Sequence, residues 1–176
     1  MPDRREGTLA VMETHPEHLH YRAQQSLVSA ATVWVELPDG RPYARIHRDE
    51  TAHGQPRWHW TGGGIGDFRI EAEASATSFL ITEVTSAPFG RIRQRGFLLP
   101  RLAAFDADGE RFVVDVDGRI TTAGSPRPTL GRIDLPAPWQ ARLELAPSSG
   151  QTLQTLQTLL VAAPLCHALQ LLLLRI

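Results

Sequence analysis

The stretch Leu153–Ile176, LQTLQTLLVAAPLCHALQLLLLRI, is the only long apolar run in the 176-residue sequence. Its length is close to the roughly 20 residues that a membrane-spanning helix requires. Five residues interrupt the run: Gln154, Gln157, Pro164, His167 and Gln170. A helix that is apolar on nearly every side either spans a membrane or is surrounded by its own protein, and polar groups cost free energy in contact with lipid. The rest of the chain decides between these interpretations.

The sequence before this run alternates between apolar and polar residues. In residues 67–74, DFRIEAEA, Phe68 and Ile70 point to one side of an extended chain, whereas Arg69 and Glu71 point to the other. The same pattern is found in residues 33–37, 112–116 and 139–145. Such alternation is typical of strands with one face in a core and the other in water. Because no helical apolar stripe persists before residue 150, we expect an all-β structure up to that point.

Three Asp-Gly pairs separate predicted strands: Asp39-Gly40, Asp108-Gly109 and Asp117-Gly118. Tight hairpin turns need positive φ, which glycine adopts freely and aspartate tolerates. Together with the alternating segments, these turns predict roughly ten short strands, a pattern typical of a sandwich or a barrel. Residues 147–150, PSSG, then break the chain, and Ser149 is a suitable N-cap for the helix that follows.

The strands must bury one apolar face, and the helix must bury apolar residues on every side. Both requirements are met if the sheet closes around the helix. We therefore predict an all-β fold with one C-terminal helix at residues 151–174, enclosed by a closed β-barrel. Residues 26–176 would form this single domain, and the polar residues 1–25 a flexible N-terminal segment. Gln157, His167 and Gln170 would then lie near strand backbone or barrel ends, where hydrogen-bond partners exist.

This pattern resembles the tubby-like fold, whose superfamily includes the tubby C-terminal domain, the phospholipid scramblases and the LURP-one-related proteins. Residues 102–118, LAAFDADGERFVVDVDG, are similar to the family's aromatic-x-Asp-Gly-x hairpins. Residues 86–96, SAPFGRIRQRG, look like its recurrent Gly-x-Ile/Val-x-Arg strand, and residues 41–48, RPYARIHR, look like an earlier copy. The apolar run resembles the family's closing helix. The resemblance extends over residues 28–176 and implies a closed barrel of about twelve strands around that helix.

The resemblance also implies a non-enzymatic binding or scaffold domain that contacts anionic phospholipid headgroups or partner proteins, without a cofactor. Two features of the eukaryotic scramblases are missing. Residues 147–160 contain no acidic residue to match their calcium-binding segment, and no cysteine-rich palmitoylation stretch precedes the predicted barrel. We therefore do not expect calcium-triggered lipid scrambling.

The charge balance excludes one class of partner. The chain has 18 basic residues, all arginine, and 19 acidic residues, so its net charge is −1. Binding of nucleic acid by bulk charge needs an excess of positive charge, so we expect no nucleic-acid partner. The single cysteine excludes an internal disulfide framework and a Cys-rich zinc site. The charged N-terminus lacks a following apolar segment, which predicts a cytoplasmic protein, peripheral to the membrane where it binds lipid.

Four arginines form the candidate anion or headgroup site. Arg91, Arg93 and Arg95 would share one face of a strand, and Arg45 lies similarly beside His47 in the related segment. Guanidinium groups in a row can hold phosphate groups by bidentate hydrogen bonds. The alternative is a solvent-exposed face whose arginines pair across the sheet with acids such as Glu71, Glu73 or Glu83.

The histidine and cysteine candidates have simpler structural interpretations. His15, His18 and His20 form a cluster, but their spacing matches no strong metal motif, so we predict no metal site. Cys166 and His167 are neighbours on a predicted helix, where adjacent side chains point about 100° apart and cannot form a dyad. Apolar surroundings would also keep the thiol protonated and inert.

Three further motifs are also interpreted as structural. Residues 61–66, TGGGIG, lack the strand–loop–helix context of a phosphate-binding loop and predict a strand connection. Trp58 and Trp60 would lie on one strand face, in the core or rim of the barrel rather than at a lipid interface. Residues 106–110, DADGE, resemble a calcium loop only superficially and predict a hairpin turn.

Two alternatives come from other classes. A tail-anchored membrane protein would use Leu153–Ile176 as its transmembrane span. A small β-barrel carrier or enzyme would enclose a ligand cavity, for which His47, His59 and Asp67 are the best polar candidates. No convergent set of acid, base and nucleophile can be named for it from the sequence.

Overall fold

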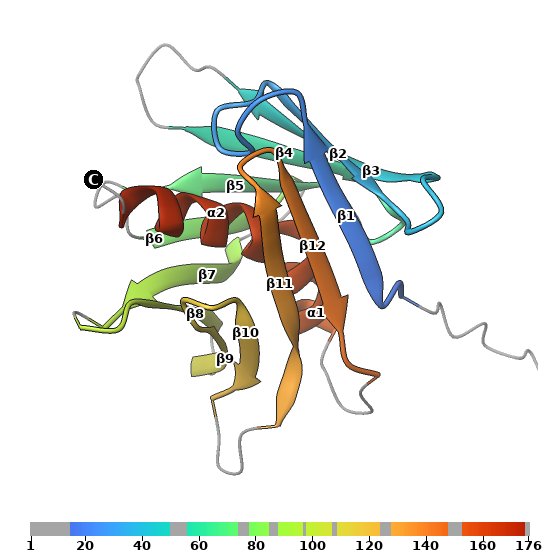
Figure 1. The fold of residues 1–176 in the computed structure, drawn as a ribbon. Coiled ribbons are helices and arrows are strands. Elements are labelled where there is room, and N and C mark those ends of the chain that lie inside the picture. Colours follow the sequence, from blue (N-terminus) through green and yellow to red (C-terminus); the bar gives the residue numbers. More distant parts are fainter. Residues whose placement is uncertain are drawn as a thin grey trace, which may run out of the picture.

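The computed structural model describes residues 15–49, 56–73, 78–84, 88–96, 98–106, 109–123, 128–147 and 153–174. These residues form twelve strands and two helices, and Figure 1 shows the helices enclosed by the strands. The strands close into an antiparallel barrel in the order β1-β12-β11-β10-β9-β8-β7-β6-β5-β4-β3-β2. Each strand therefore pairs with its neighbours in sequence, and β1 pairs with β12 to close the circle. The predicted all-β closed barrel with a C-terminal helical segment is confirmed.

The strands are β1 (His18–Ala23), β2 (Thr32–Glu36), β3 (Pro42–Asp49), β4 (Arg57–Gly62), β5 (Phe68–Ala72), β6 (Ser78–Glu83), β7 (Pro88–Arg95), β8 (Arg101–Asp106), β9 (Gly109–Val114), β10 (Arg119–Thr122), β11 (Thr129–Ala137) and β12 (Gln140–Leu145). The helices are α1 (Leu153–Val161) and α2 (Ala163–Leu173).

Side chains alternate between the core and the outer face in β1, β2, β4 and β12, as the sequence predicts. The alternation predicted for residues 112–116 is wrong, because Phe112, Val113 and Val114 are all buried and Val116 is 40% exposed. Phe68 and Ile70 of β5 are buried, and Trp58 and Trp60 of β4 lie fully in the core. Asp39-Gly40 and Asp117-Gly118 fall in turns between strands, as expected, whereas Asp108 lies outside the described residues and Gly109 begins β9. Trp139, predicted to point inward with β12, is instead 48% exposed. It lies in the turn before β12, because alternation in the sequence does not show where a strand begins.

The barrel starts earlier than predicted. β1 pairs with β12, with Leu19 opposite Leu143, and with β2, with Tyr21 opposite Val35. The predicted domain boundary at residue 26 is therefore wrong, since the barrel begins at His18. Leu19, Tyr21 and Ala23 are buried and alternate with polar residues, but this signal extends over only 6 residues. The flexibility predicted for residues 1–14 concerns residues outside those that the structure describes.

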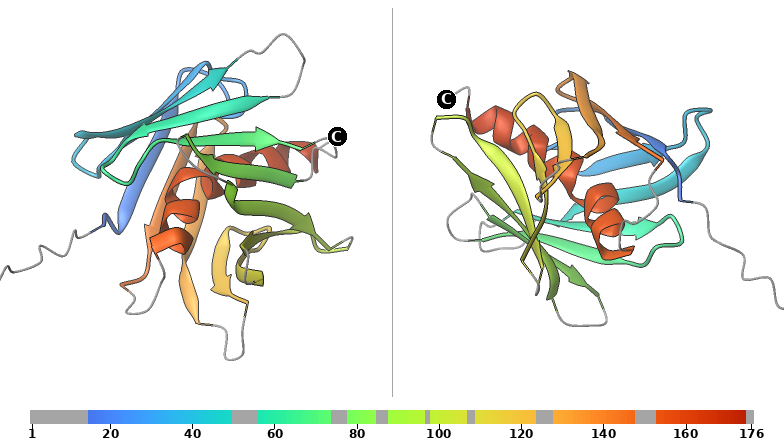
Figure 2. Two further views of the ribbon diagram at one scale, coloured as in Figure 1. Left: turned by 180° about the vertical axis from the view of Figure 1, so that it is seen from behind. Right: turned by 90° about the horizontal axis from the view of Figure 1, so that it is seen from below.

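The C-terminal helix is not continuous, contrary to the prediction of one helix over residues 151–174. α1 and α2 meet at a bend of 48°, which is visible inside the barrel in Figure 2. Pro164 stands in the first turn of α2; it has no N–H to donate to the carbonyl of Leu160, and its ring hinders that approach. The buried hydroxyl of Tyr21 donates a hydrogen bond to this carbonyl instead. Ser149, the predicted N-cap, lies outside the described residues.

The bend occupies the centre of the core. Leu159, Leu160, Val161, Ala162 and Ala163 are all 0% exposed. On the strand side, Gly90 of β7 faces α1, since a Cβ there would be in ordinary contact with the Thr158 hydroxyl, at 3.4 Å. Within the described residues no single helix is long and apolar enough to cross a membrane. The bent pair α1 and α2 together has the length and composition of a membrane-spanning segment.

Replacing Leu160 by Asp is expected to prevent folding, because a carboxylate would be buried at the bend without a partner. Leu174→Asp is the matched control, since Leu174 is 46% exposed beyond the end of α2. Circular dichroism melting of the two purified variants measures the difference. A Leu160→Asp protein that melts at the wild-type temperature would contradict an enclosed helix.

Tyr21→Phe is expected to lower the free energy of unfolding by about 1–3 kcal/mol, because the buried carbonyl of Leu160 loses its donor. Urea denaturation measures this loss in the wild-type and Pro164→Ala backgrounds. The alanine of the Pro164→Ala background supplies an N–H for the same carbonyl, so the loss should be smaller there. Equal losses in both backgrounds would show that Tyr21 does not compensate for Pro164.

Candidate functional site

Arg91, Arg93 and Arg95 share the outer face of β7, as the sequence predicts, and Ile92 between them points into the core. Two of the three are paired with acids. Arg91 Nη2 lies 3.1 Å from Glu73 Oε1, and Arg95 Nη1 lies 2.8 Å from Glu110 Oε2. Among the described residues Arg93 has no ion-pair partner. Arg91 and Arg95 thus fit the alternative prediction, in which the arginines of this face pair with acids across the sheet instead of binding an anion.

The fourth predicted residue, Arg45, lies elsewhere. It belongs to β3, and three strands separate β3 from β7 in the barrel. Its cross-strand neighbour on β2 is Trp34, and the guanidinium of Arg22 on β1 lies 5.5 Å from the centre of the Trp34 ring. The structure therefore does not bring Arg45 together with the arginines of β7.

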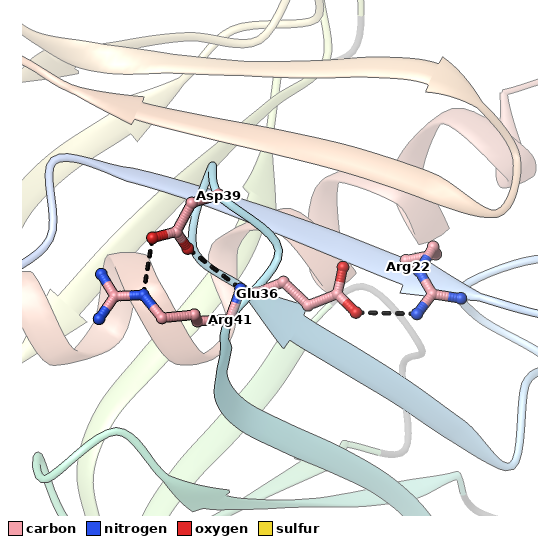
Figure 3. Close-up of polar contacts among 4 residues, drawn as sticks. All are labelled: Arg22, Glu36, Asp39 and Arg41. Atoms are coloured by element: carbon pink, nitrogen blue, oxygen red, sulfur yellow. Dashed lines mark hydrogen bonds and ion pairs between the residues drawn. The ribbon is translucent and has the colours of Figure 1, made fainter.

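Two ion pairs lie on the outer face near Arg22 and in the turn that follows β2 (Figure 3). Arg22 Nη2 donates to Glu36 Oε1 at 2.8 Å, and this bond raises the pKa of Arg22. In the turn between β2 and β3, Arg41 donates to Asp39 through its backbone N–H and its Nε, which lowers the pKa of Asp39. A shallow groove of about 90 Å³ lies beside Arg22, and its lining includes Arg142 and Glu36. These ion pairs neutralise Arg22 and Arg41, whereas Arg142 in the lining of the groove forms no ion pair with any described residue.

An apolar surface lies at the end of the barrel where α2 terminates. Leu98 and Leu99, in the turn between β7 and β8, are 88% and 76% exposed. The last residues of the α2 segment are also exposed: Leu172, Leu173 and Leu174. Figures 1 and 2 show the β7–β8 turn and the end of α2 at the same end of the barrel. We refer to these five leucines as the leucine end.

Arginines border the leucine end. Arg95 and Arg101 flank the β7–β8 turn and are cross-strand partners. Leu173 lines one small cavity together with Gln94 and Leu102, so α2 ends directly against the strands that carry these arginines. Arg101, like Arg93, forms no ion pair with any residue that the structure describes. Clustered exposed leucines are typical of surfaces that contact another molecule or a membrane.

An apolar groove of about 250 Å³ adjoins the leucine end on the other side of α2. It is lined by Ser26, Leu135, Pro136, Ala137, Pro138, Ala168, Leu171 and Leu172. The sequence prediction missed both the groove and the leucine end. The signal that was available is the run FLLP, residues 97–100, placed between two arginines in a hairpin.

The predicted histidine cluster is divided between a strand and the segment before it. His18 and His20 lie on β1, opposite Glu144 and Arg142 of β12, and His15 precedes the strand. Among the described residues no group of three or more His, Cys, Asp and Glu side chains could hold a metal ion.

Cys166 and His167 are both buried in the core. Burial raises the pKa of the Cys166 thiol and lowers the pKa of the His167 imidazole. The turn at Gly118 lies against His167, because a Cβ at Gly118 would lie 3.6 Å from His167 Nε2. Within the described residues His167 Nδ1 has no hydrogen-bond partner. We predicted a hydrogen-bond partner for His167 on strand backbone or at a barrel end, and among the described residues Nδ1 has none.

The two glutamines expected near strand backbone behave differently. Gln157 Nε2 donates to the Ile65 carbonyl at 2.9 Å, as predicted. The Gln170 amide is buried, and within the described residues neither its nitrogen nor its oxygen has a hydrogen-bond partner. The prediction is wrong for Gln170 because α2 faces the side chains of β7 and β8 at this point, rather than strand backbone.

The remaining candidates are placed as follows. Residues 61–66 lead from β4 into β5, as predicted for a strand connection. Residues 106–110 join β8 to β9, with residues 107 and 108 outside the described residues. His47 and His59 are cross-strand partners on β3 and β4. No hydrogen bond or ion pair joins Asp67 to either histidine in the described part of the chain, so the three do not form one cluster.

No protein-family model, curated protein or solved structure matches the chain.

The buried imidazole of His167 is expected to make stability fall in acid. Its pKa in the folded state lies below the ordinary 6.5 because burial disfavours the charged form. The unfolded chain therefore takes up the proton first as pH falls below about 6.5, and stability drops by at most about 1.4 kcal/mol per pH unit. Urea denaturation between about pH 7.5 and about pH 5.5 tests this. His167→Met should flatten the profile, and an unchanged profile would contradict the assignment.

Proposed function

We propose that this protein is a non-enzymatic domain of the tubby-like type that binds the surface of an anionic phospholipid membrane through its leucine end. The family part of the proposal is supported by the twelve-strand closed barrel around a C-terminal apolar helical segment. The observation that carries the functional part is the exposure of Leu98 and Leu99 in the turn that Arg95 and Arg101 flank.

The arrangement suits a membrane interface. Leucines that are already exposed can enter the boundary between headgroups and acyl chains, and each buried CH₂ contributes about 0.8 kcal/mol. Arg93 and Arg101 carry guanidinium groups without an acidic partner among the described residues, and these can contact phosphate. A basic side chain near an anionic leaflet contributes about 1 kcal/mol. The leucines would thus contact the acyl chains of the membrane, and the arginines would contact its phosphate groups.

Binding is a better proposal than catalysis for this barrel. α1 and α2 fill its interior, and Leu159–Ala163 at their junction are fully buried. The polar candidates for a catalytic cluster do not come together in the described residues, since no hydrogen bond or ion pair joins Asp67 to His47 or His59, which face each other on β3 and β4. A domain that presents its polar and apolar groups outward is suited to recognising a surface. We therefore propose a cytoplasmic protein that is peripheral to the membrane.

Vesicle co-sedimentation tests this with the full-length chain and vesicles of phosphatidylcholine, with and without phosphatidylserine. We expect binding only to the anionic vesicles, weakened by salt. Leu98→Ser/Leu99→Ser should reduce binding at least tenfold, and Arg93→Gln/Arg101→Gln by about fivefold for each arginine. Val116→Ser and Arg45→Gln are matched controls at other exposed positions, and they should bind like the wild type.

Three outcomes would contradict the proposal. Equal binding by the leucine variants would show that another face contacts lipid. Absence of binding to anionic vesicles would reject the lipid partner and favour a protein partner. Recovery of the expressed chain from membranes only with detergent would favour the tail-anchored alternative, in which the C-terminal segment leaves the barrel.

A further inference from the structure

His47 and His59 bring two imidazoles together on the outside of the barrel. They are directly opposite each other on β3 and β4. Trp58 and Trp60 on either side of His59 are buried, as is Ile46 beside His47, so both histidines point outward and are partly exposed. Side chains directly opposite in an antiparallel pair have Cβ atoms about 4.5–5.5 Å apart. Two imidazoles at that spacing can bind one ion between them.

Each imidazole already has an oxygen near one of its two nitrogens. His59 Nε2 lies 3.5 Å from Asp49 Oδ2, and His47 Nδ1 lies 3.4 Å from the hydroxyl of Thr32. Asp49 is on β3 and Thr32 on β2, so the two oxygens approach from different sides of the pair. Histidine ligands characteristically direct one ring nitrogen to such an oxygen, which orients the ring and leaves the other nitrogen for the metal. Nδ1 of His59 and Nε2 of His47 are the nitrogens left available.

The charges around the pair permit a cation. Arg57 and Arg69 on the neighbouring positions pair with Glu71, at 2.8 and 3.6 Å. Asp49 adds a negative charge beside His59. Because Arg57 and Arg69 share the one carboxylate of Glu71, that group keeps one positive charge, which the carboxylate of Asp49 balances. Arg45 has no acidic partner among the described residues.

We propose that His47 and His59 form a two-histidine site for a divalent transition-metal ion, with Cu²⁺ bound most tightly and Ni²⁺ and Zn²⁺ less so. Imidazole nitrogen suits these ions, and the order follows their general affinity for nitrogen ligands. The protein supplies two ligands, and water or an external ligand completes the coordination. Such an open site exchanges its metal readily, in contrast to a closed structural site. The proposal is independent of membrane binding, because the leucine end involves other strands.

The test is a Cu²⁺ titration of the full-length chain, followed by amide NMR spectra and by calorimetry. Paramagnetic Cu²⁺ should broaden the amide signals of residues 46–48 and 58–60 first. His47→Gln and His59→Gln should each weaken binding at this site by about tenfold or more, and Asp49→Asn by a smaller factor. All three residues lie on the outer face, so melting temperatures should stay within a few degrees of the wild type.

The control is His18→Gln/His20→Gln, which removes two histidines from the outer face of β1. This variant should keep the broadening at residues 46–48 and 58–60. Broadening confined to residues 15–20, or affinity at the pair that survives both His47→Gln and His59→Gln, would overturn the proposal. Copper binding by the N-terminal histidines alone is thereby distinguished from binding by the pair.

Discussion

The hydrogen bond from the Tyr21 hydroxyl to the Leu160 carbonyl connects the first strand of the barrel to the middle of its core. Pro164 leaves that carbonyl without a helical donor, and an unpaired backbone carbonyl in an apolar core is costly. The tyrosine that supplies the donor is itself fully buried, and burial raises its pKa well above the usual value. The hydroxyl therefore stays protonated, as a donor must be. The hydrogen bond between Tyr21 and Leu160 thus couples the bend of the helix to the position of β1 in the barrel.

The bend has consequences for the surface. Because α2 departs by 48° from the direction of α1, it runs toward β7 and β11 and ends near the β7–β8 turn. Its last leucines emerge there, and Leu98 and Leu99 extend the same apolar surface. The fully buried junction and the exposed end belong to one continuous apolar sequence. Most of this apolar sequence is buried in the core, and its last leucines form part of an exposed apolar surface.

Sequence reasoning could predict the features that depend on local pattern. The alternation in β5, the Asp-Gly turns and the need to enclose an all-apolar helix were sufficient for a closed barrel, and Arg91, Arg93 and Arg95 do share a face. Features that depend on distant partners were not accessible. Tyr21 and Leu160 are 139 residues apart, and the acids that pair with Arg91 and Arg95 come from other strands. The β3–β4 connection, residues 50–56, is longer than a tight turn, so the sequence did not specify the register that places His47 opposite His59. β1 was missed although its residues alternate between core and surface, because this alternation covers only 6 residues.

The closure of the barrel also affects how the chain folds during its synthesis. β1, the first strand, pairs with β12, and the helices that follow β12 fill the space that the strands surround. A nascent chain that still lacks α1 and α2 has the inner faces of twelve strands and nothing to cover them. Contacts between such distant segments form slowly, and exposed strands of this kind are prone to aggregation. The core of the barrel therefore cannot be completed until α1 and α2 have been synthesised.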